Sequence, residues 1–177
     1  CLNMALSRDV IFFIGNRKYS GYSMPAAKVV IVTPAPPGSR AGNRKTAIRW
    51  AQFLRDFGCR VSVLTQWVGE PCDLLVALHA SKSHDALRAF RESHPDRPAV
   101  LALTGTDIYR DIRQDRDAAA SLEMATRLIV LQKEALEELT PKQRRKARVI
   151  HQSVTSSLVP VPPVRKFRLC VLGHLRE

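Results

Sequence analysis

The sequence predicts an α/β domain with a Rossmann-like doubly wound parallel sheet. Three observations lead to this fold class: short, continuously apolar runs recur along the chain, amphipathic helical patterns separate them, and glycine or proline ends most of those patterns. Runs that are apolar without alternation are typical of parallel strands, because helices bury both faces of such a sheet. Strand, helix and strand in repetition, joined by right-handed crossovers, build a doubly wound sheet.

Apolar runs mark the expected strands. They span residues 29–33, 61–65, 74–79, 99–104 and 128–131, with a weaker sixth run at 148–151. No internal repeat or low-complexity tract competes with this assignment. In an open parallel sheet, ligands bind beyond the carboxyl ends of the strands. Function is therefore expected where these runs end.

The first expected helix spans residues 44–57. Its pattern places Ala47, Ala51 and Leu54 on one face, and Gly58 is a suitable residue to end it.

Three shorter helical patterns follow. Ser83 can cap a helix over residues 84–92, and Asp117 can start another over residues 118–125. Residues 133–139 supply a further turn or two before Pro141. These segments alternate with the expected strands, as the fold class requires.

The chain is expected to contain one domain and the beginning of another. Met24 stands just before the first strand, so residues 1–23 are treated as an upstream extension and 24–157 as the N-terminal domain. The proline-rich run 158–166 is expected to be a stiff linker. Residues 167–177 are expected to open a second domain that is truncated.

Composition indicates an ordinary globular protein with a strong positive charge. The 177 residues carry 28 Lys and Arg against 16 Asp and Glu, a formal net charge of +12 that attracts phosphates, nucleic acids or anionic lipids. Much of the excess lies in residues 40–49 and 142–148. The second run could be an RNA-binding patch. Because it has no interleaved aromatic residues for base stacking, a solvated face is favoured and no nucleic-acid partner is expected.

The chain is expected to be cytoplasmic. Its apolar runs are shorter than the roughly 18 to 20 residues that cross a bilayer, and residues 10–14 are too short for a secretory signal. Its cysteines are Cys1, Cys59, Cys72 and Cys170, and they form no C-x-x-C pair. They are expected to be reduced, buried thiols rather than disulfides or zinc ligands.

A glycine-rich segment, "TPAPPGSRAGNRKTA", follows the first strand. Gly38 and Gly42 are one residue too close for a Walker A motif, and the G-x-G-x-x-G fingerprint is missing too. Loop glycines before a helix N-terminus favour an anion, because free N–H groups and the helix dipole point towards it. A flexible turn with solvated charges is the alternative. The expected acceptor-binding or anion-binding residues here are Gly38, Ser39, Arg40, Gly42, Asn43, Arg44, Lys45 and Thr46.

Polar residues also follow the third and fourth strands. A histidine at the position of His79 is either packed in the core or acts as a ligand or acid–base group. Asp107 is either a general base or an N-cap. We assign these two as the candidate catalytic residues, and the expected acceptor site adds Ser81, Thr104, Gly105 and Thr106. No metal is expected, because the sequence has no metal-ligand spacing.

Together these segments resemble a family 4-type glycosyltransferase of the GT-B fold, and they are most similar to its selenosugar synthase branch. The resemblance is carried by "TPAPPGSRAGNRKTA", "LLVALHASKSHDA", "LALTGTDIYRDI" and "LIVLQKEALEEL", and it extends over residues 27–177. It implies an enzyme of selenoneine biosynthesis that transfers N-acetylglucosamine or glucose from a UDP-sugar to selenophosphate.

The resemblance also implies a division of labour between two domains. The N-terminal domain would hold the acceptor, with Gly42 beneath the reacting centre and with His79 and Asp107 lining the cleft. No cofactor is implied, since the UDP-sugar is a substrate. Without the second domain, the fragment is expected to be inactive.

The string "VLGHLRE" would form the donor diphosphate loop, with Gly173, His174 and Arg176 as its binding residues. Broader family members often carry arginine directly after the glycine, where this chain has His174. Arg176 is the residue that could substitute for it.

Two other classes of function compete with this interpretation. One is a non-catalytic anion-binding or nucleic-acid binding α/β module that uses residues 142–148. The unfinished strand at residue 167 disfavours such a stand-alone module. The other is an unrelated enzyme of the Rossmann type, which the glycine spacing disfavours.

Overall fold

The computed structural model describes residues 26–152. The expected upstream extension at 1–23, the linker at 158–166, the strand at 167–172 and the donor-loop residues Gly173, His174 and Arg176 lie outside the described residues.

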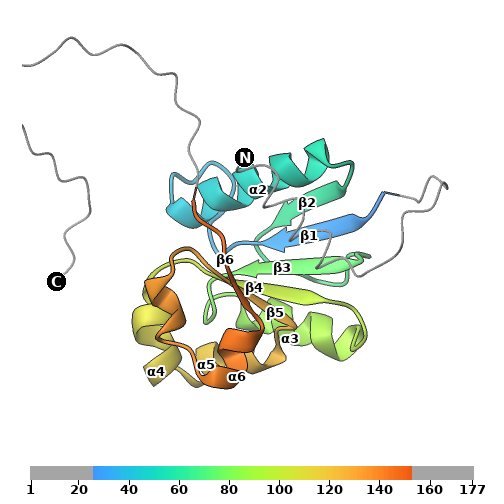
Figure 1. Cartoon of the computed structure of the whole chain (residues 1–177). Coiled ribbons are helices and arrows are strands. Elements are labelled where there is room, and N and C mark those ends of the chain that lie inside the picture. The colour runs from blue at the N-terminus through green and yellow to red at the C-terminus, as the bar shows by residue number, and fades with distance from the viewer. Residues whose placement is uncertain (1–25, 153–177) are drawn as a thin grey trace, which may run out of the picture.

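Six parallel strands form one sheet with the order β2-β1-β3-β4-β5-β6 (Figure 1). The strands are β1 (Lys28–Val32), β2 (Arg60–Leu64), β3 (Leu74–Leu78), β4 (Ala99–Leu103), β5 (Arg127–Val130) and β6 (Ala147–Val149). Each apolar run therefore forms a strand, and the first residue of each strand lies within one residue of the first residue of its run. The prediction of an α/β domain with a parallel sheet is confirmed.

Helices connect most of these strands. The longer ones are α2 (Gly42–Asp56), α3 (His84–Ser93) and α5 (Arg116–Met124). Shorter turns are the π-helical η1 (Asp107–Asp111), α4 (Ile112–Gln114), the 3₁₀ turn η2 (Glu134–Leu136) and α6 (Pro141–Arg145). No helix between residues 26 and 152 is both long enough and apolar enough to cross a membrane.

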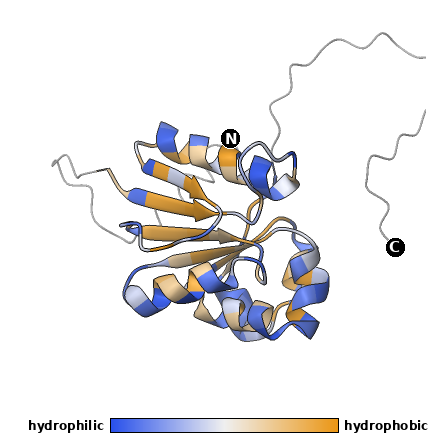
Figure 2. Ribbon diagram, turned by 180° about the vertical axis from the view of Figure 1, so that it is seen from behind, coloured by the Kyte–Doolittle hydropathy of each residue, from blue (hydrophilic) through white to orange (hydrophobic). Residues whose placement is uncertain are grey.

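The sheet buries apolar side chains on both faces. Ile31 of β1 packs on the α2 side with Trp50 and Leu54, whereas Val30 belongs to the core on the other side. That second core contains Phe90 of α3 and residues of α5. In Figure 2 the strands are mostly orange, and the helices carry their blue residues on the outside. This two-sided burial explains why the strands lack an alternating pattern.

The strand order contains a topological switch point between β1 and β3. From β1 the chain passes through α2 to β2 on one side, and it then returns to β3 on the other side. A segment without a helix makes this return, and its Trp67 packs edge-to-face on Phe90 with 5.4 Å between ring centroids. Ligands of doubly wound sheets bind at such a switch point, beyond the carboxyl ends of the strands.

One expected helix cap is confirmed in position, and another is wrong. Ser83 holds the N-cap position of α3, but its hydroxyl donates to the carbonyl of Leu78 at 2.7 Å and makes no capping hydrogen bond. Asp115, rather than Asp117, caps α5, because its carboxylate accepts the backbone N–H of Asp117 at 2.8 Å. Gly58 does end α2 as expected, with a left-handed φ of 82° that suits glycine.

Candidate functional site

The carboxyl edge of the sheet brings the predicted site segments together. Thr33 follows β1, His79 follows β3, Thr104 follows β4, and α2 begins at the same edge. Neighbouring strands lie about 4.8 Å apart, so the ends of β1 and β4 are separated by roughly 10 Å. That distance suits one small ligand that contacts several strand ends at once.

The N-terminus of α2 is electropositive. Its N-cap residue is Ala41, which offers no side-chain cap, and its first turn contains no acidic residue. The loop before it turns at Gly38, whose φ is 79°, and Ser39 Oγ accepts the backbone N–H of Ala41 at 3.1 Å. A Cβ atom built on Gly38 or Gly42 would meet nothing within 4 Å. The backbone here is thus open to a ligand, and the helix dipole favours an anion.

Two polar side-chain atoms at this edge of the sheet are buried without a hydrogen-bond partner. They are Thr33 Oγ1 and Arg44 Nη1. Thr33 is fully buried, and the alternation of β1 places it on the same face as Ile31, beneath α2. An unsatisfied buried donor is costly, and such groups are rare unless a ligand or another partner completes them. Thr33 Oγ1 and Arg44 Nη1 are therefore two atoms whose hydrogen bonding an anion could complete.

The remaining predicted residues of this segment differ in their exposure and hydrogen bonding. Arg40 and Lys45 are exposed, and Asn43 is half-buried. Thr46 is buried, and its hydroxyl accepts a bond of 2.9 Å from Gln152 Nε2. This hydroxyl can still donate its own proton, so Thr46 both fixes the chain after β6 and keeps one donor for a ligand.

His79 has a strained backbone and a defined tautomer. Its φ is 80°, an uncommon value for a residue other than glycine, and its side chain is buried. Its Nδ1 accepts the backbone N–H of Lys82 at 3.4 Å, and its Nε2 lies 3.8 Å from Asp111 Oδ2. The imidazole therefore carries its proton on Nε2, on the side of Asp111. Strain of this kind often accompanies functional positions.

Burial lowers the pKa of His79 below its ordinary value of 6.5. The negative charge of Asp107 opposes this shift, and that of Asp111 does so too, but desolvation is the largest effect. The ring is consequently neutral at pH 7, which leaves it able to donate one hydrogen bond and accept another.

The structure gives Asp107 the geometry of a structural clamp. It is fully buried, and its carboxylate accepts backbone N–H groups of Thr104, Gly105 and Ala80 at 3.0, 2.7 and 3.2 Å. This residue opens η1, but Thr106 holds the N-cap position, so the alternative that Asp107 is an N-cap is wrong. A carboxylate so fully bonded favours holding the ends of β3 and β4 together over acting as a general base.

The other predicted residues surround this clamp. Thr104 and Gly105 present their backbone N–H groups to Asp107 rather than to the cleft, and the side chain of Thr106 is exposed. Ser81 hydrogen-bonds Asp115, and this bond is the largest cause of the lowered pKa of that carboxyl. Ser81 thereby joins the turn after β3 to the start of α5.

Thr33, Asp111 and Tyr109 belong to this edge but were missed as site residues from the sequence. A hydroxyl residue directly after an apolar strand was a usable signal for Thr33. Asp111 and Tyr109 both lie in the π-helical turn η1, which has no simple sequence pattern.

The basic run 142–148 is mostly engaged within the domain. Lys142 pairs with Glu123 at 2.7 Å, and Lys146 donates to the carbonyl of Ala125 at 2.7 Å. Burial lowers the pKa of Lys146. Thr140 and Gln143 form a capping box that starts α6. These contacts favour the solvated-face interpretation over a nucleic-acid patch.

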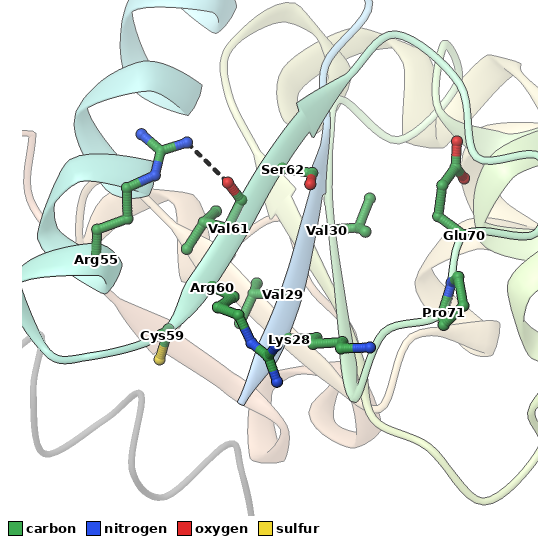
Figure 3. Close-up of a pocket in the computed structure, with 10 residues that line it drawn as sticks. All are labelled: Lys28, Val29, Val30, Arg55, Cys59, Arg60, Val61, Ser62, Glu70 and Pro71. Carbon is green, nitrogen blue, oxygen red and sulfur yellow. Dashed lines mark hydrogen bonds between the residues drawn. The ribbon is translucent and has the colours of Figure 1, made fainter. Parts of the chain in front are cut away.

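A groove of about 510 Å³ lies away from the predicted site. It flanks the outer strand β2 near the amino ends of the strands, and Figure 3 shows its lining residues. Arg55 of α2 donates to the carbonyl of Val61 at 2.7 Å there. This guanidinium covers part of the open edge of the sheet, which protects it from pairing with another strand.

The cysteines and metal ligands give no second site. Cys59 and Cys72 are free thiols, and burial raises the pKa of Cys72 to about 11. Cys1 and Cys170 lie outside the described residues. Between residues 26 and 152 no cluster of three or more His, Cys, Asp or Glu could hold a metal ion.

Neither the protein-family models nor the curated proteins include a match to this chain. The fold and the site thus define it as an α/β protein with a six-stranded parallel sheet and a candidate anion site at the carboxyl edge.

We expect His79 to make stability depend on pH. Its pKa is lower in the folded state than in the unfolded chain, so the unfolded chain binds the proton more readily below about pH 6.5. The contribution is complete above that pH and is lost as the pH falls through it. Urea unfolding between pH 5 and 8 should show a smaller decrease in stability for His79→Gln than for the unchanged chain. The exposed His151→Gln serves as the control, and an equal slope in the His79 variant would contradict the expectation.

Proposed function

We propose that this chain contains the acceptor-binding domain of a UDP-sugar-dependent glycosyltransferase of the GT-B type. The enzyme would transfer N-acetylglucosamine or glucose to a small anionic acceptor, selenophosphate, to form a selenosugar. The resemblance of the strand-end segments to the selenosugar synthase branch supports this function, and the Rossmann-like sheet is compatible with it. We also propose that the complete enzyme has the GT-B fold, with a second domain that binds the UDP-sugar donor.

The observation that carries the proposal is the electropositive N-terminus of α2. It combines a helix N-terminus without an acid or side-chain cap with two buried polar atoms that lack partners, Thr33 Oγ1 and Arg44 Nη1. A phosphate-like dianion would satisfy the guanidinium, the hydroxyl and the first N–H groups of the helix. Selenophosphate has three such oxygens and one selenium atom, so the oxygens can be held while the selenium faces the sugar.

The proposed reaction forms one bond and breaks one. Selenium attacks the anomeric carbon, and the bond from that carbon to the β-phosphate oxygen of UDP breaks, so that UDP leaves with the electron pair. The chain's own groups would act by positioning the acceptor and by balancing its charge. The neutral imidazole of His79 directly follows β3, which is next to β1 in the sheet, and can donate a hydrogen bond without adding charge.

The direct test uses the complete reading frame of the gene. The encoded enzyme, given UDP-N-acetylglucosamine or UDP-glucose with selenophosphate, should release UDP and form a selenium–carbon bond detectable by mass spectrometry. Inorganic phosphate in place of selenophosphate is the control, because it offers similar oxygens but no selenium nucleophile. Tight anion binding without UDP release would instead support a non-catalytic anion-binding module.

Gly42→Ala tests the close approach of the anion to the helix start. Gly42 has no positive φ, and an added Cβ would meet nothing within 4 Å, so folding should be unchanged or stabilised by up to about 1 kcal/mol. A bound anion would contact the new methyl group, and we expect weaker binding of selenophosphate in calorimetry.

Gly58→Ala is the matched control at the other end of α2. Its φ of 82° makes alanine costly, by roughly 1 kcal/mol, while anion affinity should stay the same. Unchanged affinity in Gly42→Ala would exclude a close approach at this residue.

A further inference from the structure

Tyr109 is an exposed aromatic side chain at the carboxyl edge. Within residues 26–152 the exposed rings of Phe, Tyr or Trp are Phe57 and Tyr109. Phe57 ends α2 at the opposite edge of the sheet, whereas Tyr109 lies in η1 directly after β4 and is 43% exposed. Exposed aromatic area at the end of a central parallel strand is a recognisable feature of ligand sites.

The ring of Tyr109 is held in place from two strands. Its hydroxyl accepts a hydrogen bond from Gln132 Nε2, and Gln132 comes shortly after β5. Its backbone belongs to the π-helical turn η1, which begins at the buried clamp residue Asp107. The ring therefore reaches from the end of β4 towards the end of β5. Fixing it in advance reduces the conformational entropy that a ligand must overcome to stack on it.

The segment of Tyr109 and the candidate anion site lie at the same edge of the sheet. Thr33 follows β1, and two strand spacings of about 4.8 Å separate β1 from β4 in the sheet. His79, at the end of β3, lies between them in the strand order. The segments that carry Arg44, His79 and Tyr109 thus follow three neighbouring strands at one edge of the sheet.

We propose that Tyr109 is the stacking platform for the pyranose ring of the transferred sugar. This inference rests on the proposed glycosyltransferase function and names the sugar as the ligand of its second subsite. The apolar C–H face of the pyranose lies on the aromatic face, and Gln132 keeps the ring in the stacking orientation. The flanking residues Gly105 and Thr106 leave room for the ligand, since both are exposed.

Fluorine NMR of this chain tests the platform directly. The sequence has three tyrosines, Tyr19, Tyr22 and Tyr109, so 3-fluorotyrosine labelling gives three signals, and Tyr109→Phe assigns one of them by its loss. N-acetylglucosamine and glucose should each shift the Tyr109 signal in a saturable way. Uridine monophosphate should not shift it, and myo-inositol is a control for nonspecific polyol effects.

Variants separate the ring from its hydrogen bond, with tryptophan fluorescence or calorimetry to measure sugar affinity. Tyr109→Leu should weaken binding by about threefold to tenfold, as expected for the loss of one aromatic contact. Tyr109→Phe and Gln132→Leu keep the ring and should cost less. If Tyr109→Leu does not fold, the two conservative variants and the fluorine signal still decide the question.

The outcomes distinguish this inference from the proposed function. If the fluorine signal of Tyr109 does not shift with the sugars, or shifts with uridine monophosphate, the proposal that Tyr109 stacks on the sugar is wrong, even if the complete enzyme releases UDP. A saturable response to the sugars supports it even if UDP release fails.

Discussion

Replacing Asp107 by alanine is expected to lower the free energy of unfolding by about 3 to 5 kcal/mol, because the carboxylate is buried and fully bonded. It accepts backbone N–H groups of Thr104, Gly105 and Ala80, and the N–H of the fully buried Ala80 would find no other partner in the interior. The bond to Ala80 joins the turn after β3 to the turn after β4. Urea unfolding at a single pH measures the loss.

Two further variants serve as controls for Asp107→Ala. Asp107→Asn keeps one acceptor oxygen and should lose less stability than alanine. Asp85→Asn changes an aspartate that is 89% exposed and pairs with Arg88, so its effect should stay within about 0.5 kcal/mol. If Asp107→Ala folded with nearly unchanged stability, the carboxylate could not be a clamp, and its predicted role as a general base would regain weight.

The strands of this domain were predictable from the sequence because strands that are buried on both faces consist of consecutive apolar residues. Residues such as Ile31 and Leu101 are fully buried on opposite faces, and the strand positions between them are apolar too. The boundaries of α2 were less predictable. Its first turn, from Gly42, contains residues with no apolar pattern, so periodicity placed the start at Arg44 instead.

The caps show where local rules gave way to tertiary contacts. Ser83 is a favoured N-cap residue, but Leu78 O lies within reach of its hydroxyl and accepts that proton instead. For α5 the two acids Asp115 and Asp117 are equally plausible by residue type. The extended backbone of Asp115, with φ −107° and ψ 119°, makes it the cap, and sequence carries no record of that angle.

Topology predicted the location of the candidate site better than the roles of its residues. All the strand-end segments meet at the carboxyl edge, as a parallel sheet requires. Whether a carboxylate faces a ligand or backbone N–H groups depends on the conformation of the loop that carries it. Asp107, chosen as a catalytic candidate, proved to be bonded within the fold, whereas Thr33, which was not chosen, has a buried hydroxyl without a partner.

Arg44→Ala is expected to weaken binding of selenophosphate by about 10-fold to 100-fold, the effect of losing roughly 1.5 to 3 kcal/mol from a charged hydrogen bond. Its Nη1 atom is buried and unpartnered, so the anion would be its first hydrogen-bond acceptor. Isothermal titration calorimetry with the purified chain measures the change. Arg55→Ala is the matched control, since it removes the same charge from the same helix about 16 Å away. Equal losses in both variants would show that only the general positive field attracts the anion.

Thr33→Val distinguishes a binding role from a structural role, because the two roles predict different changes in stability and in anion affinity. Valine has nearly the same shape, so it removes the unpaired hydroxyl at Thr33 without opening a cavity, and stability should be unchanged or higher by up to about 1 kcal/mol. Affinity for selenophosphate should fall by about threefold to tenfold, the effect of one ordinary hydrogen bond. A group maintained for folding would give the opposite result, with lower stability and unchanged affinity. The combination of a more stable chain and a weaker ligand is therefore the specific sign that the sheet keeps an unsatisfied hydroxyl beneath α2 for an anion.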